Sequence, residues 1–194
     1  QSLAATGNAS FGYFGGGAPS YSTVDRIDYT NDTATAVVKG PLSFGRKGLR
    51  ATGNASFGYF SCGFYYTSIV DRIDYSNDTA TAAVKGPLSA VKVRGGATGN
   101  EDFGYFGGGT SSVDRVDYSN DTATAVAKGP LSVARSHLAA TGNASFGYFG
   151  GGYPGPYSTV DRVDYSNDTA TAVAKGPLSV ARYLLAATGN SNFG

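Results

Sequence analysis

The eighteen-residue segment YSNDTATAVAKGPLSVAR occurs twice without any change, at Tyr118–Arg135 and at Tyr165–Arg182. Near copies stand at Tyr29–Arg46 and at Tyr75–Lys92. A catalytic site is normally encoded once, whereas a segment that recurs four times is typical of a structural unit stacked on copies of itself. Each copy is too short to hold a hydrophobic core of its own, so the chain is predicted to be one repeat domain.

The repeat has a period of 43 to 47 residues. Its motif ATGN ends at positions spaced by 46, 46, 43 and 47 residues, namely Asn8, Asn54, Asn100, Asn143 and Asn190. Within the single domain of residues 1–194 we place repeats at about residues 3–48, 49–94, 95–137 and 138–184, with a partial fifth repeat at 185–194. Because Leu3–Gly12 and Leu185–Gly194 are nearly identical, we expect the chain to be a slice of a longer array.

The residue pattern inside one repeat favours four short β-strands, which we call A to D. No apolar stripe of helical spacing runs for three turns, and Gly, Thr, Ser, Asn and Asp are frequent. In the fourth repeat we expect strands at about residues 138–141, 146–152, 159–166 and 169–176, with a turn at Asn167-Asp168. Four antiparallel strands per repeat predict an all-β chain, a β-propeller of four blades; a β-solenoid is the alternative.

The repeat resembles the kelch repeat of β-propellers. A glycine pair follows the aromatic FGYF segment at residues 15–16, 107–108 and 150–151, whereas SCG stands there in the second copy. The kelch tyrosine matches Tyr29, Tyr75, Tyr118 and Tyr165. Seventeen residues after each tyrosine, the kelch arginine matches Arg46, Lys92, Arg135 and Arg182. Alanine replaces the kelch tryptophan at Ala36, Ala82, Ala125 and Ala172.

This resemblance implies kelch-like, four-stranded blades across essentially the whole chain. Such blades close into a ring, by themselves, as part of a larger ring, or through pairing between chains. The amino-acid sequence of the repeat is also similar to the sequences of repeat proteins predicted in marine viruses of cyanobacteria.

The composition argues against several classes of partner. The chain has 15 basic and 14 acidic residues, a net charge of +1, so we expect no nucleic-acid binding. No run approaches the roughly 18 apolar residues of a membrane span, so we expect no membrane insertion. The only cysteine, Cys62, excludes an internal disulfide framework.

The sequence offers little for catalysis, and we predict that the chain is not an enzyme and needs no cofactor or metal. His137 is the only histidine, and the repeat that contains Cys62 has none to activate it. We expect Cys62 to be a small buried thiol and His137 a loop residue. The DRVDYSND carboxylates do not have the spacing of a calcium loop, and we expect them to pair with basic residues such as Lys128 and Arg135 on adjacent strands.

The repeats differ from one another almost only in the B–C and D–A loops, which lie on one face of an up-and-down blade. These loops carry aromatic and basic residues, which are enriched where interfaces hold their binding energy and which stack on sugar rings. The candidate ligand-binding residues are Tyr21, Phe64, Tyr65, Tyr66, Tyr153, Tyr157, Arg46, Arg94 and His137, with Lys47, Arg50 and Lys92 on the same face.

Our leading hypothesis is a non-catalytic β-propeller for assembly or adhesion, on a virion fibre or cell surface, which binds a glycan or protein partner through this loop face. We also expect self-association and an extracellular or virion-surface location. The alternatives are a purely structural, filament-forming array and a propeller enzyme with its site in the central funnel. In a secreted eukaryotic protein, seven asparagines would be glycosylation candidates: Asn8, Asn31, Asn54, Asn77, Asn120, Asn143 and Asn167.

Overall fold

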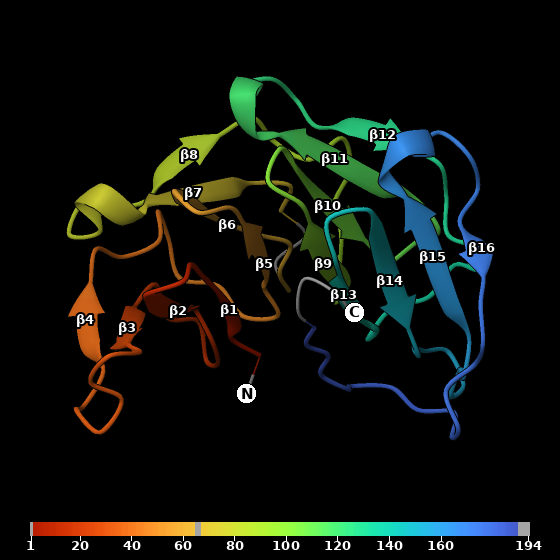
Figure 1. Cartoon of the computed structure of the whole chain (residues 1–194), viewed down its shortest axis with the longest axis horizontal. Helices are drawn as coiled ribbons and strands as arrows, with labels where there is room; N and C mark the ends of the chain where they lie inside the picture. The colour runs from red at the N-terminus through yellow and green to blue at the C-terminus, as the bar shows by residue number, and fades with distance from the viewer. Residues whose placement is uncertain (1, 65–66, 190–194) are drawn as a thin grey trace.

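The structure is a computed structural model that describes residues 2–64 and 67–189. These residues form four antiparallel sheets of four strands each, arranged side by side in an arc (Figure 1). The strand order within every sheet follows the chain, so each strand pairs with the one before it. The predicted all-β class and four-stranded unit are confirmed, and the arrangement is propeller-like. Every ladder in the described part is antiparallel, unlike the parallel stacking of a β-solenoid.

Each sheet corresponds to one repeat. Sheet 1 consists of β1 (Ala4–Gly7), β2 (Phe11–Gly15), β3 (Val24–Asp28) and β4 (Val37–Lys39). Sheet 2 consists of β5 (Arg50–Gly53), β6 (Phe57–Ser61), β7 (Val70–Asp74) and β8 (Ala83–Lys85). Sheet 3 consists of β9 (Gly96–Gly99), β10 (Phe103–Gly107), β11 (Val113–Asp117) and β12 (Val126–Lys128). Sheet 4 consists of β13 (Ala139–Gly142), β14 (Phe146–Gly150), β15 (Val160–Asp164) and β16 (Val173–Ala174).

The third and fourth strands of sheet 4 are shorter than predicted. The third ends at Asp164 because the 3-10 helix η3 (Tyr165–Asn167) begins there, with the Asp164 carboxylate accepting from the amide of Ser166. The fourth is only β16, since the preceding residues turn back and the Ala170 amide donates to the Asn167 carbonyl. Equivalent 3-10 helices are η1 (Tyr75–Asn77) and η2 (Tyr118–Asn120).

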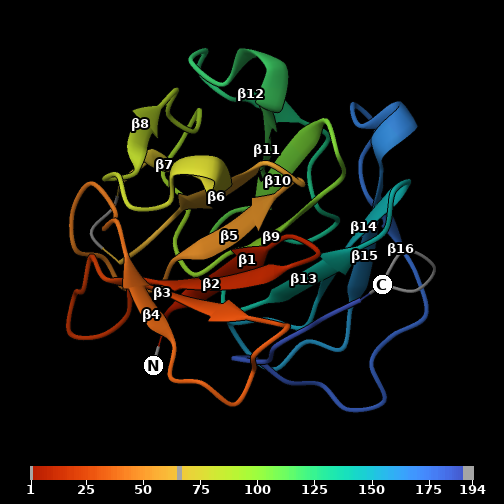
Figure 2. The ribbon, with the colours of Figure 1, turned by 60° about the vertical axis from the view of Figure 1, so that its left-hand side comes forward.

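The first strands of the sheets lie at the centre of the arc and the fourth strands at its periphery (Figure 2). β1 packs against β5, β5 against β9, and β9 against β13. Among the described strands, no comparable contact joins β13 to β1, so sheets 1 and 4 are the two ends of the arc.

The hydrophobic core is divided among the three junctions between consecutive sheets. The core between sheets 2 and 3, for example, combines Tyr59 and Leu88 from sheet 2 with Phe106 and Val116 from sheet 3. The other two cores are built in the same way. A single sheet therefore has no core of its own, which is the physical reason for the stacking of repeats.

Candidate functional site

The recurrent segment YSNDTAT builds the junctions between sheets. Asp121, at the end of η2, is 7% exposed and accepts three donors from sheet 2. The Tyr59 hydroxyl donates at 2.9 Å, Arg72 Nη1 at 2.7 Å, and Lys85 Nζ lies 3.2 Å away. The same arrangement surrounds the equivalent aspartates of sheets 2 and 4, Asp78 and Asp168.

Acidic and basic residues do pair, but the prediction that they pair across adjacent strands of one sheet is wrong. Lys128 pairs with Asp168 at 3.1 Å, and Arg135 pairs with Asp161 at 2.7 Å, both in the following sheet. The basic side chains at and after the fourth strand extend across the junction, where burial makes an unpaired carboxylate costly. These ions are therefore structural, as expected, but they join sheets rather than strands.

Arg46 does not belong to a ligand-binding face. Its side chain is fully buried, forms an ion pair with Asp71 of sheet 2 and donates to the Ile69 carbonyl at 3.0 Å. Lys92, at the equivalent place, is buried beside Asp114 at 3.4 Å. In the first three repeats, the basic residue that ends the recurrent segment stabilises the junction with the next sheet. It enters the core only where a carboxylate meets it.

Six side chains from the B–C and D–A loops form one continuous group, which we call the loop cluster: Lys47, Phe64, Arg94, His137, Tyr153 and Tyr183. These loops meet at one end of the sheets because every sheet is connected in strand order.

The contacts within the loop cluster run from one end of the arc to the other. Lys47 Nζ lies 5.1 Å, and Arg94 Cζ 4.4 Å, from the centroid of the Phe64 ring. Arg94 Nη1 also contacts His137 Nε2.

On the other side of His137, the cluster continues through two tyrosines. The His137 ring meets the Tyr153 ring edge to face, with centroids 5.7 Å apart. Tyr153 in turn lies 5.8 Å from Tyr183. Both tyrosines are 48% exposed, so a large part of each ring faces solvent.

Arg94 and His137 occupy equivalent repeat positions with a left-handed backbone, at φ of 52° and 54°. Leu184 and Gly48, their counterparts, have φ of 57° and 75°. The His137 amide donates to the Arg94 carbonyl at 2.6 Å, and the Leu184 amide to the His137 carbonyl at 3.0 Å. Left-handed residues other than glycine are strained, and they concentrate at functional sites.

The Arg94–His137 contact favours a neutral imidazole. Burial lowers the pKa of His137, and the nearby positive charges of Arg94 and Arg50 lower it further. The other ring nitrogen, Nδ1, lies 2.8 Å from the Ser136 hydroxyl. At neutral pH the positive charge of the cluster therefore resides on Arg94 and Lys47.

The remaining predicted ligand-binding residues are spread more widely. Tyr21 is exposed, and Tyr157 is half-buried in a β-bridge with Arg182. Tyr65 and Tyr66 lie outside the described residues. Sequence reasoning missed Tyr183, although it stands in a variable D–A loop, which is the signal that could have identified it.

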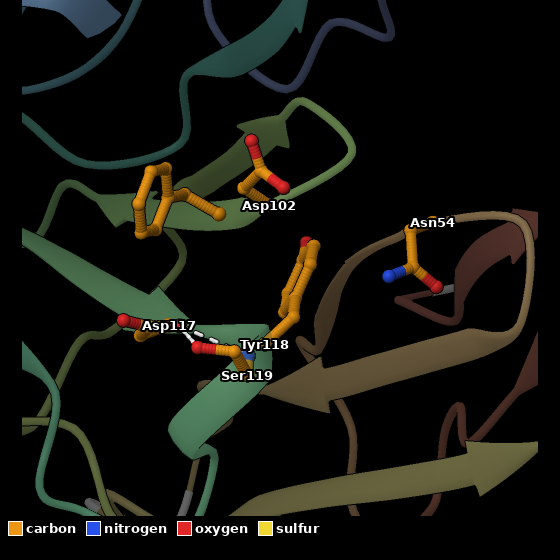
Figure 3. Close-up of a pocket in the computed structure, with 6 residues that line it drawn as sticks. Asn54, Asp102, Asp117, Tyr118 and Ser119 are labelled. Carbon is orange, nitrogen blue, oxygen red and sulfur yellow. Dashed lines mark hydrogen bonds between the residues drawn. The ribbon is translucent and has the colours of Figure 1, made fainter.

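A pocket of about 360 Å³ lies at the other end of the sheets, away from the loop cluster (Figure 3). It is lined by Asn54, Asp102, Phe103, Asp117, Tyr118 and Ser119. The Asp117 carboxylate accepts from the Ser119 amide at 2.9 Å and from its hydroxyl at 2.7 Å. The hydrogen bonds that Ser119 donates lower the pKa of Asp117. The carboxylate in this pocket therefore already has hydrogen-bond partners within its own turn. In the described part of the chain, no group of three His, Cys, Asp or Glu residues is placed to hold a metal ion.

The glycosylation candidates fall into two structural classes. The Asn54 carbonyl oxygen accepts from the amides of Ser56 and Phe57, and its amide nitrogen donates to Glu101 of sheet 3 at 3.1 Å. Asn8 and Asn143 accept the same two backbone bonds. Four others are exposed, namely Asn31, Asn77, Asn120 and Asn167.

Cys62 is the buried thiol that the sequence predicts. Its side chain is fully enclosed, and burial raises its pKa to about 12, in spite of the positive charges of Arg50, Lys92 and Arg46 nearby. A thiol in this state is a poor nucleophile at neutral pH.

Comparison with known proteins identifies the fold but not the function. No protein-family model and no curated protein sequence matches the chain. Among solved structures, one described as the structure of YjhT is similar with a TM-score of 0.80 and 11% sequence identity, over 99% of this chain and 75% of that chain. The described residues contain no helix with the length and apolar character needed to span a bilayer.

Proposed function

We propose that the chain is a non-catalytic recognition module made of four kelch-like β-propeller blades, and that its loop cluster binds a glycan that carries acidic groups. The observation that carries this proposal is the combination of half-exposed rings and cationic groups in one continuous surface. Tyr153 and Tyr183 lie at one end of that surface, and Arg94 and Lys47 lie in its middle and at its other end.

The chemistry of the loop cluster suits an acidic sugar. An exposed tyrosine ring offers an apolar face for the C–H surface of a sugar and a hydroxyl for its polar groups. The Arg94 guanidinium presents several donors in one plane, which matches a carboxylate or sulfate group. The contacts with Phe64 and His137 hold this guanidinium in place before the ligand arrives, which reduces the entropy lost on binding.

The described residues give little support to the alternative of a propeller enzyme. A propeller enzyme would need a nucleophile and a base, but Cys62 is buried with a raised pKa, and His137 is engaged by Arg94 and Ser136. A glycan-binding role fits a protein of a cell surface or virion fibre, and this location belongs to the proposal.

A glycan array with the purified chain tests the proposal, followed by calorimetric titration of the best acidic glycan. We expect Arg94→Ala and Tyr153→Ala each to weaken binding by about tenfold or more, since one charge-assisted contact or one stacked ring contributes about 1–3 kcal/mol. Val126→Ala is the matched control, because it removes an equally exposed apolar side chain far from the loops, on β12.

Two results would overturn the proposal. One is an array on which no acidic glycan is retained above background. The other is binding that Arg94→Ala and Tyr153→Ala leave as strong as the Val126→Ala control.

A further inference from the structure

The three internal junctions follow one rule. A tyrosine, an arginine and a lysine of one sheet point at a single aspartate of the next sheet. At the junction between sheets 3 and 4, Tyr105, Arg115 and Lys128 surround Asp168 at 2.9, 2.8 and 3.1 Å. The recurrence of these groups in every repeat means that both ends of the arc carry them too.

Sheet 4 presents the three donors without an acceptor. Tyr148, Arg162 and Lys175 are the counterparts of the donors in sheet 3, and we call this surface the donor face. Tyr148 and Arg162 are half-buried and Lys175 is exposed. The Arg162 guanidinium lies 4.3 Å above its own Phe146 ring, and among the described residues it has no carboxylate partner.

The donor face also has space where the internal junctions are closed. A Cβ added to Gly86 or Gly129 would lie 1.8 Å from a backbone oxygen of the next sheet, so only glycine fits there. A Cβ added to the equivalent Gly176 meets no atom of the described residues within 4 Å. Leu178 is likewise only partly buried, whereas its counterpart Leu131 is 2% exposed.

Sheet 1 presents the acceptor without donors, on what we call the acceptor face. Asp32, the counterpart of the buried Asp168, is exposed and forms no ion pair with a described residue. Tyr29 is 53% exposed, whereas Tyr118 in the equivalent place is 8% exposed and stacks on Tyr59 of the preceding sheet.

A second ion pair is split between the two faces in the same way. At the last internal junction Arg135 of sheet 3 meets the buried Asp161 of sheet 4. Its counterpart on the donor side, Arg182, is exposed, and the counterpart of Asp161 on sheet 1, Asp25, is only half-buried. The donor and acceptor faces are therefore complementary in charge, in shape and in the aromatic pair that each junction stacks.

We propose that the donor face of one molecule binds the acceptor face of a second copy, which forms a fourth junction with the same contacts as the three internal ones. In this junction Tyr148, Arg162 and Lys175 surround Asp32 of the second copy. The interface is heterologous, since two different surfaces meet, and such contacts build closed rings or linear arrays.

The segment after β16 bears on how the second copy docks. It runs back toward the centre of the arc (Figure 1), and Leu185 packs beside Gly151, just as Leu138 packs beside Gly108. This is the place of the first strand of a following sheet. Residues 185–189 repeat the sequence LAATG of residues 3–7, so either segment supplies the strand that pairs with β2 of the incoming copy.

Sedimentation velocity across a concentration series tests the proposal with the 194-residue chain. We expect reversible association of the wild type, and an apparent dissociation constant at least tenfold higher for Asp32→Lys and for Arg162→Glu. An equimolar mixture of these two variants regains association. The unchanged donor face of Asp32→Lys meets the unchanged acceptor face of Arg162→Glu, and in the other pair of faces Lys at position 32 meets Glu at position 162. Glu101→Lys, an exposed change of equal charge, is the control and keeps the wild-type constant.

Gly176→Ala provides a second variant that does not depend on charge. Its methyl group meets no described residue of its own chain within 4 Å, so we expect the free energy of unfolding to be unchanged. The same group meets the backbone of the docked copy and weakens association at least tenfold. The proposal is overturned if the wild type is monomeric throughout the series, if Gly176→Ala associates like the wild type, or if the mixed variants associate no better than each alone. None of these variants alters the loop cluster, so glycan binding is judged separately.

Discussion

Tyr59 stacks on Tyr118 of the next sheet, with ring centroids 4.5 Å apart, while its hydroxyl donates to Asp121 at 2.9 Å. One side chain thus provides both the apolar and the polar contact of a junction. Burial and the neighbouring Asp121 carboxylate both raise the pKa of the Tyr59 hydroxyl, which keeps it protonated and able to donate.

The two roles of Tyr59 can be separated by Tyr59→Phe, which keeps the stacked ring and removes the hydrogen bond. We expect the free energy of unfolding to fall by about 1.5–3 kcal/mol, the usual effect of losing a hydrogen bond to a charged group. Urea denaturation of the monomer measures this change. Tyr148→Phe is the matched control, and an equal loss at both positions would contradict our account of the junction.

Arginines with the same local sequence should differ in their effect on stability. Arg115→Ala removes one of three donors from the nearly buried Asp168 and should destabilise the chain by about 2–3 kcal/mol. Arg162→Ala should change the stability of the monomer by less than about 0.5 kcal/mol, as for most surface substitutions. Thermal unfolding at low protein concentration compares the two, and similar melting temperatures would disprove the distinction.

Gly86→Ala should be among the most damaging single substitutions in the chain. Its new Cβ would lie 1.8 Å from the Ala123 carbonyl oxygen, a backbone atom that cannot move without opening the junction. We expect a loss of at least about 3 kcal/mol, measured by urea denaturation, from this overpacking. Wild-type stability of Gly86→Ala would contradict the close approach of sheets 2 and 3 at this position.

Acid should weaken the junctions. Burial by itself would raise the pKa of Asp78, but the hydrogen bond from Tyr13 and the cations Lys39 and Arg26 outweigh it and hold the pKa below its usual value. A carboxylate of this kind adds stability above the pKa of the unfolded chain, near 4, and the contribution is lost as the pH falls through the lower folded pKa.

We therefore expect the free energy of unfolding to be steady near neutral pH and to decrease below about pH 4. Urea denaturation at pH 7 and pH 3 measures the difference. Asp78→Asn should be less stable at pH 7 but should lose less on acidification than the wild type. An equal pH dependence in both proteins would exclude Asp78 as a source of the effect.

The left-handed residues of the loop cluster allow binding to be separated from folding. Arg94→Gly and His137→Gly relieve backbone strain of about 1–2 kcal/mol, while glycine loses more entropy on folding by about 0.5–1 kcal/mol. The stability of each variant should thus stay within about 1 kcal/mol of the wild type. Glycan binding by Arg94→Gly should be lost, as titration calorimetry would reveal. A marked drop in melting temperature would mean that Arg94 is chiefly a structural residue.

The repeat made the strand-level fold predictable from the sequence. The aromatic second strand, such as Phe146–Gly150, and the VDR strand were expected close to their observed places, because four copies reinforce one pattern. The fourth strand was predicted to be longer than it is. A run of Thr and Ala residues does not reveal where the turn after η3 ends and the pairing of β16 begins.

The site was harder to predict than the fold. Arg46 was wrongly assigned to the ligand-binding face, although its recurrence as Arg135 within the constant segment marked it as part of the junctions. Nor does a repeated pattern reveal whether Lys128 pairs within its own sheet or with the next one. The left-handed positions of Arg94 and His137 had one sequence signal, the glycine at the equivalent Gly48.

The placement of the core between sheets has a consequence for how such a chain can evolve. Each repeat carries both halves of a junction, the donors and the aspartate, in its constant segments. A repeat gained by duplication therefore arrives with two surfaces that already match its neighbours, and no new interface has to be selected. The loops outside the junctions, including those that bear Arg94 and Tyr153, remain free to diverge in every new copy. A gene of this kind lengthens by copying, while the loops of each added unit diverge independently of the junctions.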